Sequence, residues 1–127
     1  MGKLFLAGIG GFIGSIFRYA VTGLVQNWSH SIYFPYGTLA VNLVGCFAIG
    51  FLSQLAETRG VFNADTRTLI FIGVLGGFTT FSAFGNETMN LWRDGENFLA
   101  AANVAAHLVL CLGAVSLSRA LAYQIWR

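Results

Sequence analysis

Uncharged hydrogen-bond donors recur at helical spacing inside long apolar stretches of this chain. Thr38 and Asn42 are four residues apart, as are Asn103 and His107, so each pair shares one face if its segment is helical. Polar side chains are costly within a membrane and usually have a function there. Hydroxyl, amide and ring N–H donors suit a small, hard anion that exchanges its water shell for hydrogen bonds. The alternative is that these side chains join neighbouring helices by hydrogen bonds.

A stretch rich in glycine and threonine, residues 73–84, reads G-V-L-G-G-F-T-T-F-S-A-F. Glycines and β-branched threonines weaken a helix, so we predict a membrane helix that is interrupted near its middle. Such broken helices often hold ions through freed carbonyl groups. Phe78, Phe81 and Phe84 follow at a spacing of three, and the partly positive edges of their rings also suit an anion. The alternative is a glycine-rich packing face with the phenylalanines turned to lipid.

Further polar residues extend the candidate ion pathway within the apolar segments: Arg18, Thr80, Ser82 and Glu87. Arg18 and Glu87 have the alternative of pairing with each other or of reaching the membrane interface. Cys46 and Cys111 lie in apolar runs without metal-binding spacing, and we interpret both as small buried apolar residues. The sequence contains no evident nucleophile–base pair or metal cluster, so an enzyme is not expected.

Membrane helices must position these residues. The chain has 127 residues, of which 56% are hydrophobic and 9% are charged, far below the roughly 25% of a soluble domain. About 20 apolar residues span a bilayer, and four segments qualify, at about 3–26, 36–56, 68–92 and 98–123. We predict an all-α membrane protein in which residues 1–127 form a single four-helix transmembrane domain. The net charge of +2 is too small for a nucleic-acid surface.

The loops and the small residues add expectations about assembly. Asp65 or Thr66 is a candidate N-cap of the third helix. Small residues spaced four apart, such as Gly73 and Gly77, let helices approach closely within a chain or between two chains. A homodimer is the simplest way to enclose a solvated path with so small a chain.

Both termini and the second loop should share one side, with most of the basic residues: Lys3, Arg59, Arg67, Arg127 and, nearby, Arg119. The side with the termini carries more basic residues than the other side, whose loop carries Arg93. By the positive-inside rule this excess favours a cytoplasmic N-terminus.

Three stretches resemble signatures of the CrcB/Fluc family of fluoride channels. G-G-F-T-T-F-S-A-F, from Gly76, is similar to G-G-x-T-T-F-S-T-F, with Ala83 in place of a hydroxyl residue. G-G-F-I-G-S-I-F-R-Y, from Gly10, is similar to G-G-x-x-G-x-x-x-R-[YW]. G-T-L-A-V-N-L-V-G, from Gly37, is similar to G-T-L-x-V-N-x-x-G. All three occur in the family's order, and the resemblance covers the whole chain.

The resemblance implies an antiparallel, dual-topology homodimer with two fluoride pores and a central sodium ion that is structural and not transported. Backbone carbonyls of Gly76 and Thr79 would hold the sodium. Phe81 and Phe84 would be the pore phenylalanines, with Asn42 beside them. Thr38, Ser82, Glu87 and Arg18 match further polar positions, while Asn103 and His107 stand on a fourth-helix track that often carries hydroxyl groups.

The function implied is passive exit of fluoride through a multi-pass channel in a prokaryotic plasma membrane, which lowers the toxicity of cytoplasmic fluoride. The alternative is a small dual-topology, proton-coupled drug exporter. That mechanism needs a membrane-embedded carboxylate in the first span, which instead carries Arg18. A third possibility, a non-transporting subunit of a membrane complex, would need neither a donor-lined track nor a helix break.

Overall fold

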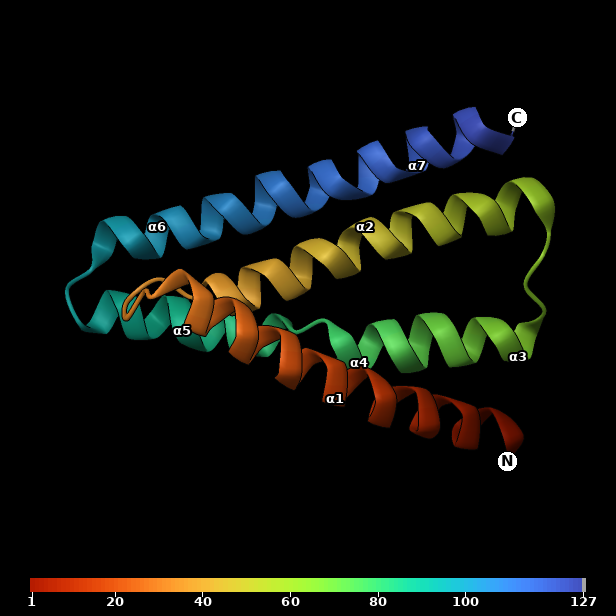
Figure 1. The fold of residues 1–127 in the computed structure, drawn as a ribbon, viewed down its shortest axis with the longest axis horizontal. Coiled ribbons are helices and arrows are strands. Elements are labelled where there is room, and N and C mark those ends of the chain that lie inside the picture. The colour runs from red at the N-terminus through yellow and green to blue at the C-terminus, as the bar shows by residue number, and fades with distance from the viewer. Residues whose placement is uncertain (127) are drawn as a thin grey trace.

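The computed structural model describes residues 1–126 and consists of four long helical runs joined by short loops (Figure 1). The first two runs are α1 (Gly2–Ser29) and α2 (Tyr36–Arg59). The third comprises α3 (Ala64–Arg67), the π-helical η1 (Thr68–Leu75), α4 (Gly76–Phe78) and α5 (Phe81–Arg93). The fourth comprises α6 (Asn97–Ala106), the π-helical η2 (His107–Cys111) and α7 (Leu112–Trp126). Each of the 4 runs is long and apolar enough to cross a membrane, which confirms the predicted all-α membrane architecture.

The termini and the α2–α3 loop lie at one end of the molecule, and the other two loops lie at the opposite end (Figure 1). Arg127, one of the basic residues counted above, lies outside the described residues. The prediction that Asp65 or Thr66 caps the third run is wrong. Asn63 is the N-cap, because its side chain accepts a 2.8 Å hydrogen bond from the Thr66 amide and the helix begins at Ala64.

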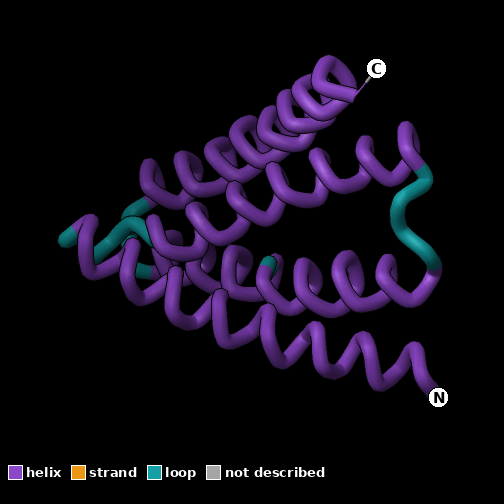
Figure 2. Tube along the Cα trace, turned by 45° about the vertical axis from the view of Figure 1, so that its right-hand side comes forward, coloured by secondary structure: helices purple, strands orange, loops and turns teal. Residues whose placement is uncertain are grey.

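The third run contains two extended residues between α4 and α5, visible as a short loop in Figure 2. Thr79 has φ −81° and ψ 159°, and Thr80 has φ −152° and ψ 115°. The hydroxyl of Thr80 caps α5 by accepting a 3.1 Å hydrogen bond from the Ala83 amide. The Thr79 hydroxyl instead donates to the Leu75 carbonyl at 2.9 Å, so each threonine satisfies a backbone group next to the extended residues.

Glycines set how closely the helices pack. α1 lies along η1 and α4, and α2 lies along α7. A Cβ atom on Gly10 would lie 2.7 Å from the Gly73 Cα, and one on Gly77 would lie 2.6 Å from the Gly11 carbonyl oxygen. Real side chains do not fit at these separations, so α1 and the third run are in backbone contact.

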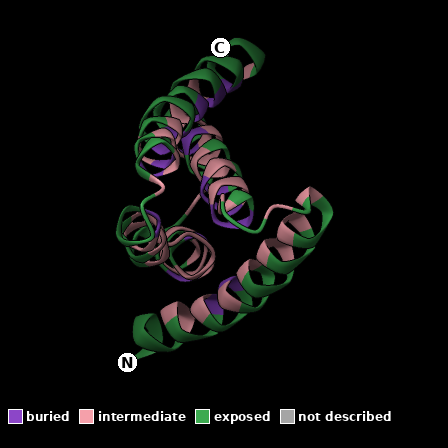
Figure 3. Ribbon diagram, turned by 90° about the vertical axis from the view of Figure 1, so that its left-hand side faces the viewer, coloured by how far each residue is buried: buried purple, intermediate pink, exposed green. Residues whose placement is uncertain are grey.

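The buried residues form only a narrow strip between the helices, and most outward surfaces are exposed in the single chain (Figure 3). Large apolar side chains are among the exposed ones, including Phe5, Phe12, Trp28 and Phe98. Exposed apolar side chains in such number are typical of a protein surrounded by lipid or by a partner.

Candidate functional site

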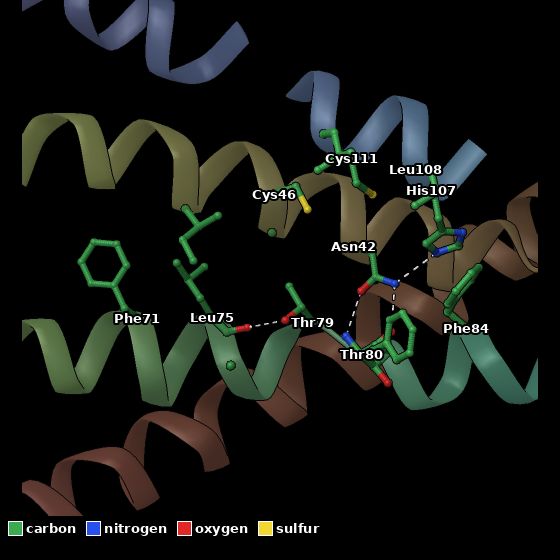
Figure 4. A pocket seen from close by; sticks show the side chains of 15 residues that line it. Asn42, Cys46, Phe71, Leu75, Thr79, Thr80, Phe84, His107, Leu108 and Cys111 are labelled. Atoms are coloured by element: carbon green, nitrogen blue, oxygen red, sulfur yellow. Dashed lines mark hydrogen bonds between the residues drawn. The ribbon is translucent and has the colours of Figure 1, made fainter. Parts of the chain in front are cut away.

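The site is built around Asn42, which α2 directs at the extended residues of the third run. Its Oδ1 accepts a 2.8 Å hydrogen bond from the Thr80 amide, and its Nδ2 donates to the Thr80 carbonyl at 2.9 Å (Figure 4). In a continuous helix the Thr80 amide would donate to the Gly76 carbonyl. Asn42 therefore replaces the helix as the partner of Thr80, and only 8% of Asn42 is exposed.

His107, at the start of η2, contacts the same amide from the opposite side. Its Nε2 lies 3.1 Å from Asn42 Nδ2, and its Nδ1 lies 3.0 Å from the Asn103 carbonyl oxygen. The imidazole also packs against Phe84 with 4.3 Å between ring centroids, and Phe84 lies 5.4 Å from the ring of Phe81. Residues from α2, α5 and η2 thus converge at one place.

A cavity of about 390 Å³ joins these side chains. Its lining includes Asn42, Thr80, Phe81, Phe84 and His107, five of the residues predicted to form the ion pathway. Gly76 and Thr79 also line it, so the two carbonyls implicated in sodium binding lie beside the same space. The cavity combines the partly positive edges of aromatic rings with amide and hydroxyl groups, and no acidic residue lines it.

A second and larger hollow lies between α1, the start of α2 and α5. It is lined by the remaining polar candidates of the first three runs: Arg18, Thr38, Ser82 and Glu87. Thr80 lines this hollow as well as the cavity, so it stands between the two. Together the two spaces bring nine of the ten predicted pathway residues to the neighbourhood of the extended segment.

Glu87 and Arg18 do not form an ion pair with each other. The hydroxyl of Thr38 donates to Glu87 Oε1 at 2.8 Å, and the other carboxylate oxygen of Glu87 is buried without a hydrogen-bond partner among the described residues. Arg18 Nη1 donates to the Thr79 carbonyl at 3.2 Å. Thr38 of α2 therefore binds Glu87, whereas the backbone of the third run binds Arg18.

The backbone next to Thr80 has carbonyl groups that could bind a hard cation. The i+4 amide donors of Gly76 and Thr79 are engaged elsewhere, by Asn42 Oδ1 and by the Thr80 hydroxyl respectively. The Gly76 carbonyl is therefore released from the helical ladder, and the Thr79 carbonyl accepts a hydrogen bond from the Arg18 guanidinium. A carbonyl oxygen has two lone pairs, so Thr79 retains one for a ligand. The carbonyl oxygens of Gly76 and Thr79 are ligands of the kind that suits a monovalent cation such as sodium.

The structure places the last candidate, Asn103, outside both spaces. Its side chain is fully buried and donates to the Thr88 hydroxyl at 2.9 Å, which joins α6 to α5. Its backbone carbonyl is the part that reaches the site, through His107. Asn86 lines the second hollow and was not singled out from the sequence. Asn86 lies four residues after Ser82, so helical spacing places the two on one face and could have identified Asn86 from the sequence.

The chain is similar to known proteins over most of its length. The family model described as CrcB-like protein, Camphor Resistance (CrcB), matches residues 5–119. A protein of Opitutus terrae named fluoride-specific ion channel FluC is 50% identical over 110 residues, which cover 84% of this chain and 82% of the relative.

Two further relatives carry similar names. The fluoride-specific ion channel FluC of Elusimicrobium minutum is 46% identical over 110 residues, covering 87% of this chain and 85% of the relative. Fluoride-specific ion channel FluC 1 of Methanosarcina acetivorans is 41% identical over 119 residues, covering 94% and 89%. These names describe a channel and not an enzyme. The chain is therefore a multi-pass prokaryotic membrane protein that belongs to the CrcB family.

Proposed function

We propose that this protein is a fluoride-selective channel that lets fluoride leave the cell passively across the plasma membrane. The observation that carries the proposal is the convergence of Asn42, Phe81 and Phe84 on one cavity beside the extended Thr79–Thr80 segment. Relatives at 40–50% identity named fluoride-specific ion channel support the choice of anion. Uncharged donors and ring edges replace the water shell of a small anion, whereas a cation path would call for acidic residues or carbonyls.

The pathway follows from the arrangement of the two spaces. Arg18, Ser82, Thr38 and Glu87 form the polar entrance, Thr80 stands at its inner side, and Phe81 and Phe84 continue beyond it. Arg18 supplies positive charge at the entrance, while Thr38 holds Glu87 by a hydrogen bond. The anion then meets hydroxyl groups and ring edges in succession, which lowers the cost of each dehydration step.

The functional unit that we propose is an antiparallel homodimer with the third membrane helix of each chain broken at its middle. Phe81, a proposed pore residue, is 81% exposed in the single chain, so a partner is needed to enclose the pathway. An antiparallel arrangement brings both extended segments to the same depth. Its two orientations in the membrane make the protein dual-topology.

A structural sodium ion at the dimer centre completes the proposal. Gly76 and Thr79 provide two carbonyls in each chain, which are too few to replace the hydration shell of an ion. Two chains about a twofold axis provide four such oxygens. The carbonyls would hold the ion without transporting it, and the ion would tie together the two segments that have lost their helical partners.

The test is fluoride efflux from liposomes that contain the purified protein, followed with a fluoride electrode. We expect fluoride to leave down its own gradient, with chloride efflux smaller by orders of magnitude. The flux should persist when the proton gradient is collapsed, since no coupling is involved. Chloride flux comparable with fluoride flux, or a requirement for a proton gradient, would contradict the proposal.

A further inference from the structure

The hydrogen bonds around Asn42 define the tautomer of His107. Because Asn42 Oδ1 accepts from the Thr80 amide, the other end of the side chain is the NH₂ group, which is a donor only. His107 Nε2, at 3.1 Å from that nitrogen, must be an acceptor. The Asn103 carbonyl, at 3.0 Å from His107 Nδ1, can only accept, so Nδ1 carries the hydrogen. Both contacts require the same neutral tautomer.

The same geometry engages both donors of Asn42. One N–H binds the Thr80 carbonyl and the other binds His107 Nε2, so neither is free to meet an anion in the cavity. The bond to Thr80 is half of a two-point pairing that also holds the extended backbone. The bond to His107 is independent of that pairing, so it is the bond that can be released without disturbing the segment.

We propose that His107 is a positioning residue of the anion pathway, which withholds the second Asn42 N–H while neutral and releases it when the imidazole is protonated. This inference rests on the proposed fluoride conduction. Protonation places a hydrogen on Nε2, so two donors then face each other and the contact to Asn42 is lost. The released N–H becomes available to fluoride, and a positively charged ring stands 4.3 Å from the Phe84 ring. Both changes favour an anion, so fluoride flux increases as pH falls.

Other titratable or charged groups lie on the elements around the imidazole. Cys46 on α2 and Cys111 on η2 line the same cavity. Glu87 on α5 binds Thr38, and Arg18 on α1 binds the Thr79 carbonyl. None of these four side chains hydrogen-bonds the His107 ring within residues 1–126, so replacing His107 isolates its contribution from theirs.

The experiment measures fluoride efflux from proteoliposomes with equal pH on both sides, in steps from about pH 8 to about pH 5.5, the range in which histidine ordinarily titrates. Protein-free vesicles measure the leak of hydrogen fluoride at each pH, which is subtracted. The variant is His107→Gln, whose side-chain oxygen accepts from Asn42 but does not titrate. The matched control is His30→Gln, since His30 is the other histidine of the chain and lies exposed after α1.

We expect wild-type flux to increase roughly fivefold over this range, the equilibrium equivalent of one net hydrogen bond. His30→Gln should keep that dependence, and His107→Gln should lose it. A wild-type flux independent of pH, or the same increase in His107→Gln, would overturn the inference while leaving fluoride conduction intact. Absence of fluoride flux from the wild type at every pH would refute the proposed function instead.

If His107→Gln does not assemble, a spectroscopic measurement of the His107 tautomer and protonation tests the inference instead. Nitrogen-15 NMR of imidazole-labelled protein in membranes distinguishes the two neutral tautomers, and His30→Gln leaves only the His107 signal. The inference requires the Nδ1–H form at high pH and conversion to imidazolium over the range in which flux increases. An Nε2–H tautomer, or a ring that stays neutral throughout, would refute it.

Discussion

Asn42 pairs with both backbone groups of Thr80, accepting from its amide at 2.8 Å and donating to its carbonyl at 2.9 Å. A side chain on α2 therefore supplies the partner that the Thr80 amide lacks in the extended segment, and it adds a donor to the Thr80 carbonyl. Unpaired backbone groups are costly in a bilayer, where no water replaces the lost partner. The pairing makes one side chain responsible both for the local fold of the third run and for the lining of the cavity.

Asn42→Asp tests this double role. The carboxylate would lack the N–H donors that bind the Thr80 carbonyl and His107, and its negative charge would face both the carbonyl and the anion. We expect fluoride efflux to be abolished and the free energy of unfolding to fall by about 1–3 kcal/mol. Efflux and thermal unfolding in detergent measure the two effects. Asn97→Asp, at an exposed position at the start of α6, is the matched control and should change neither.

Phe81→Ile separates the pathway from stability. Phe81 is 81% exposed in the chain, so its replacement removes few contacts within the monomer but takes away a ring edge from the proposed pore. We expect efflux to be lost while the dimer still assembles, as followed by size-exclusion chromatography. Phe98→Ile is matched in exposure, at 82%, and lies away from the cavity, so its flux should remain near wild type. Wild-type flux in Phe81→Ile would remove this residue from the pathway.

Gly77→Ala tests the contact between α1 and the third run. Its new Cβ would lie 2.6 Å from the Gly11 carbonyl oxygen and 2.9 Å from the Gly11 Cα, so the two backbones must separate. Overpacking of this kind costs about 1–3 kcal/mol, which thermal unfolding should detect as a lower midpoint. Gly8→Ala, which meets nothing within 4 Å, should be neutral or stabilising because alanine is the better helix former. Equal midpoints for the two variants would argue against a rigid contact.

Sodium removal tests the proposed ion at the dimer centre. A ligand that binds only the assembled state stabilises it by about 2.7 kcal/mol at roughly one hundred times its Kd. Replacing sodium with N-methylglucamine should therefore weaken the dimer and stop fluoride flux. Thr79→Ser, which keeps the backbone carbonyl and the hydroxyl that binds Leu75, should behave like wild type. Unchanged dimer dissociation and unchanged flux after thorough sodium removal would show that the extended segment has another purpose.

The orientation of the chain can be measured with a single cysteine. The basic residues favour a cytoplasmic N-terminus, whereas an antiparallel dimer requires both orientations in equal numbers. Asn97→Cys, at an exposed position near the α5–α6 loop and in a background without Cys46 and Cys111, should react with an impermeant thiol reagent in about half of the molecules. Labelling of all molecules, or of none while unfolded protein reacts, would indicate a single orientation.

Helix periodicity by itself determined which polar residues share a face. Thr38 and Asn42 are both buried on α2, and Asn103 and His107 are both buried at the α6–η2 junction. Four apolar segments determined the number of long helices, because spanning length and apolar composition are local properties of the chain. The sequence could not identify which residue is the N-cap of the third run, because Asn63, Asp65 and Thr66 are all suitable N-cap residues and lie within one turn.

Tertiary structure alone decided which groups bind one another. Asn42 and His107 are 65 residues apart. The local sequence around each residue does not indicate that α2 and η2 bring them together, or that both N–H groups of Asn42 are hydrogen-bonded. Arg18 and Glu87 offered an obvious pair by charge, yet they bind Thr79 and Thr38. The reason is that close contacts at glycines, between α1 and the third run and between α2 and α7, set how the helices lie against one another. Hydrogen bonds form only between groups that this packing brings within about 3 Å.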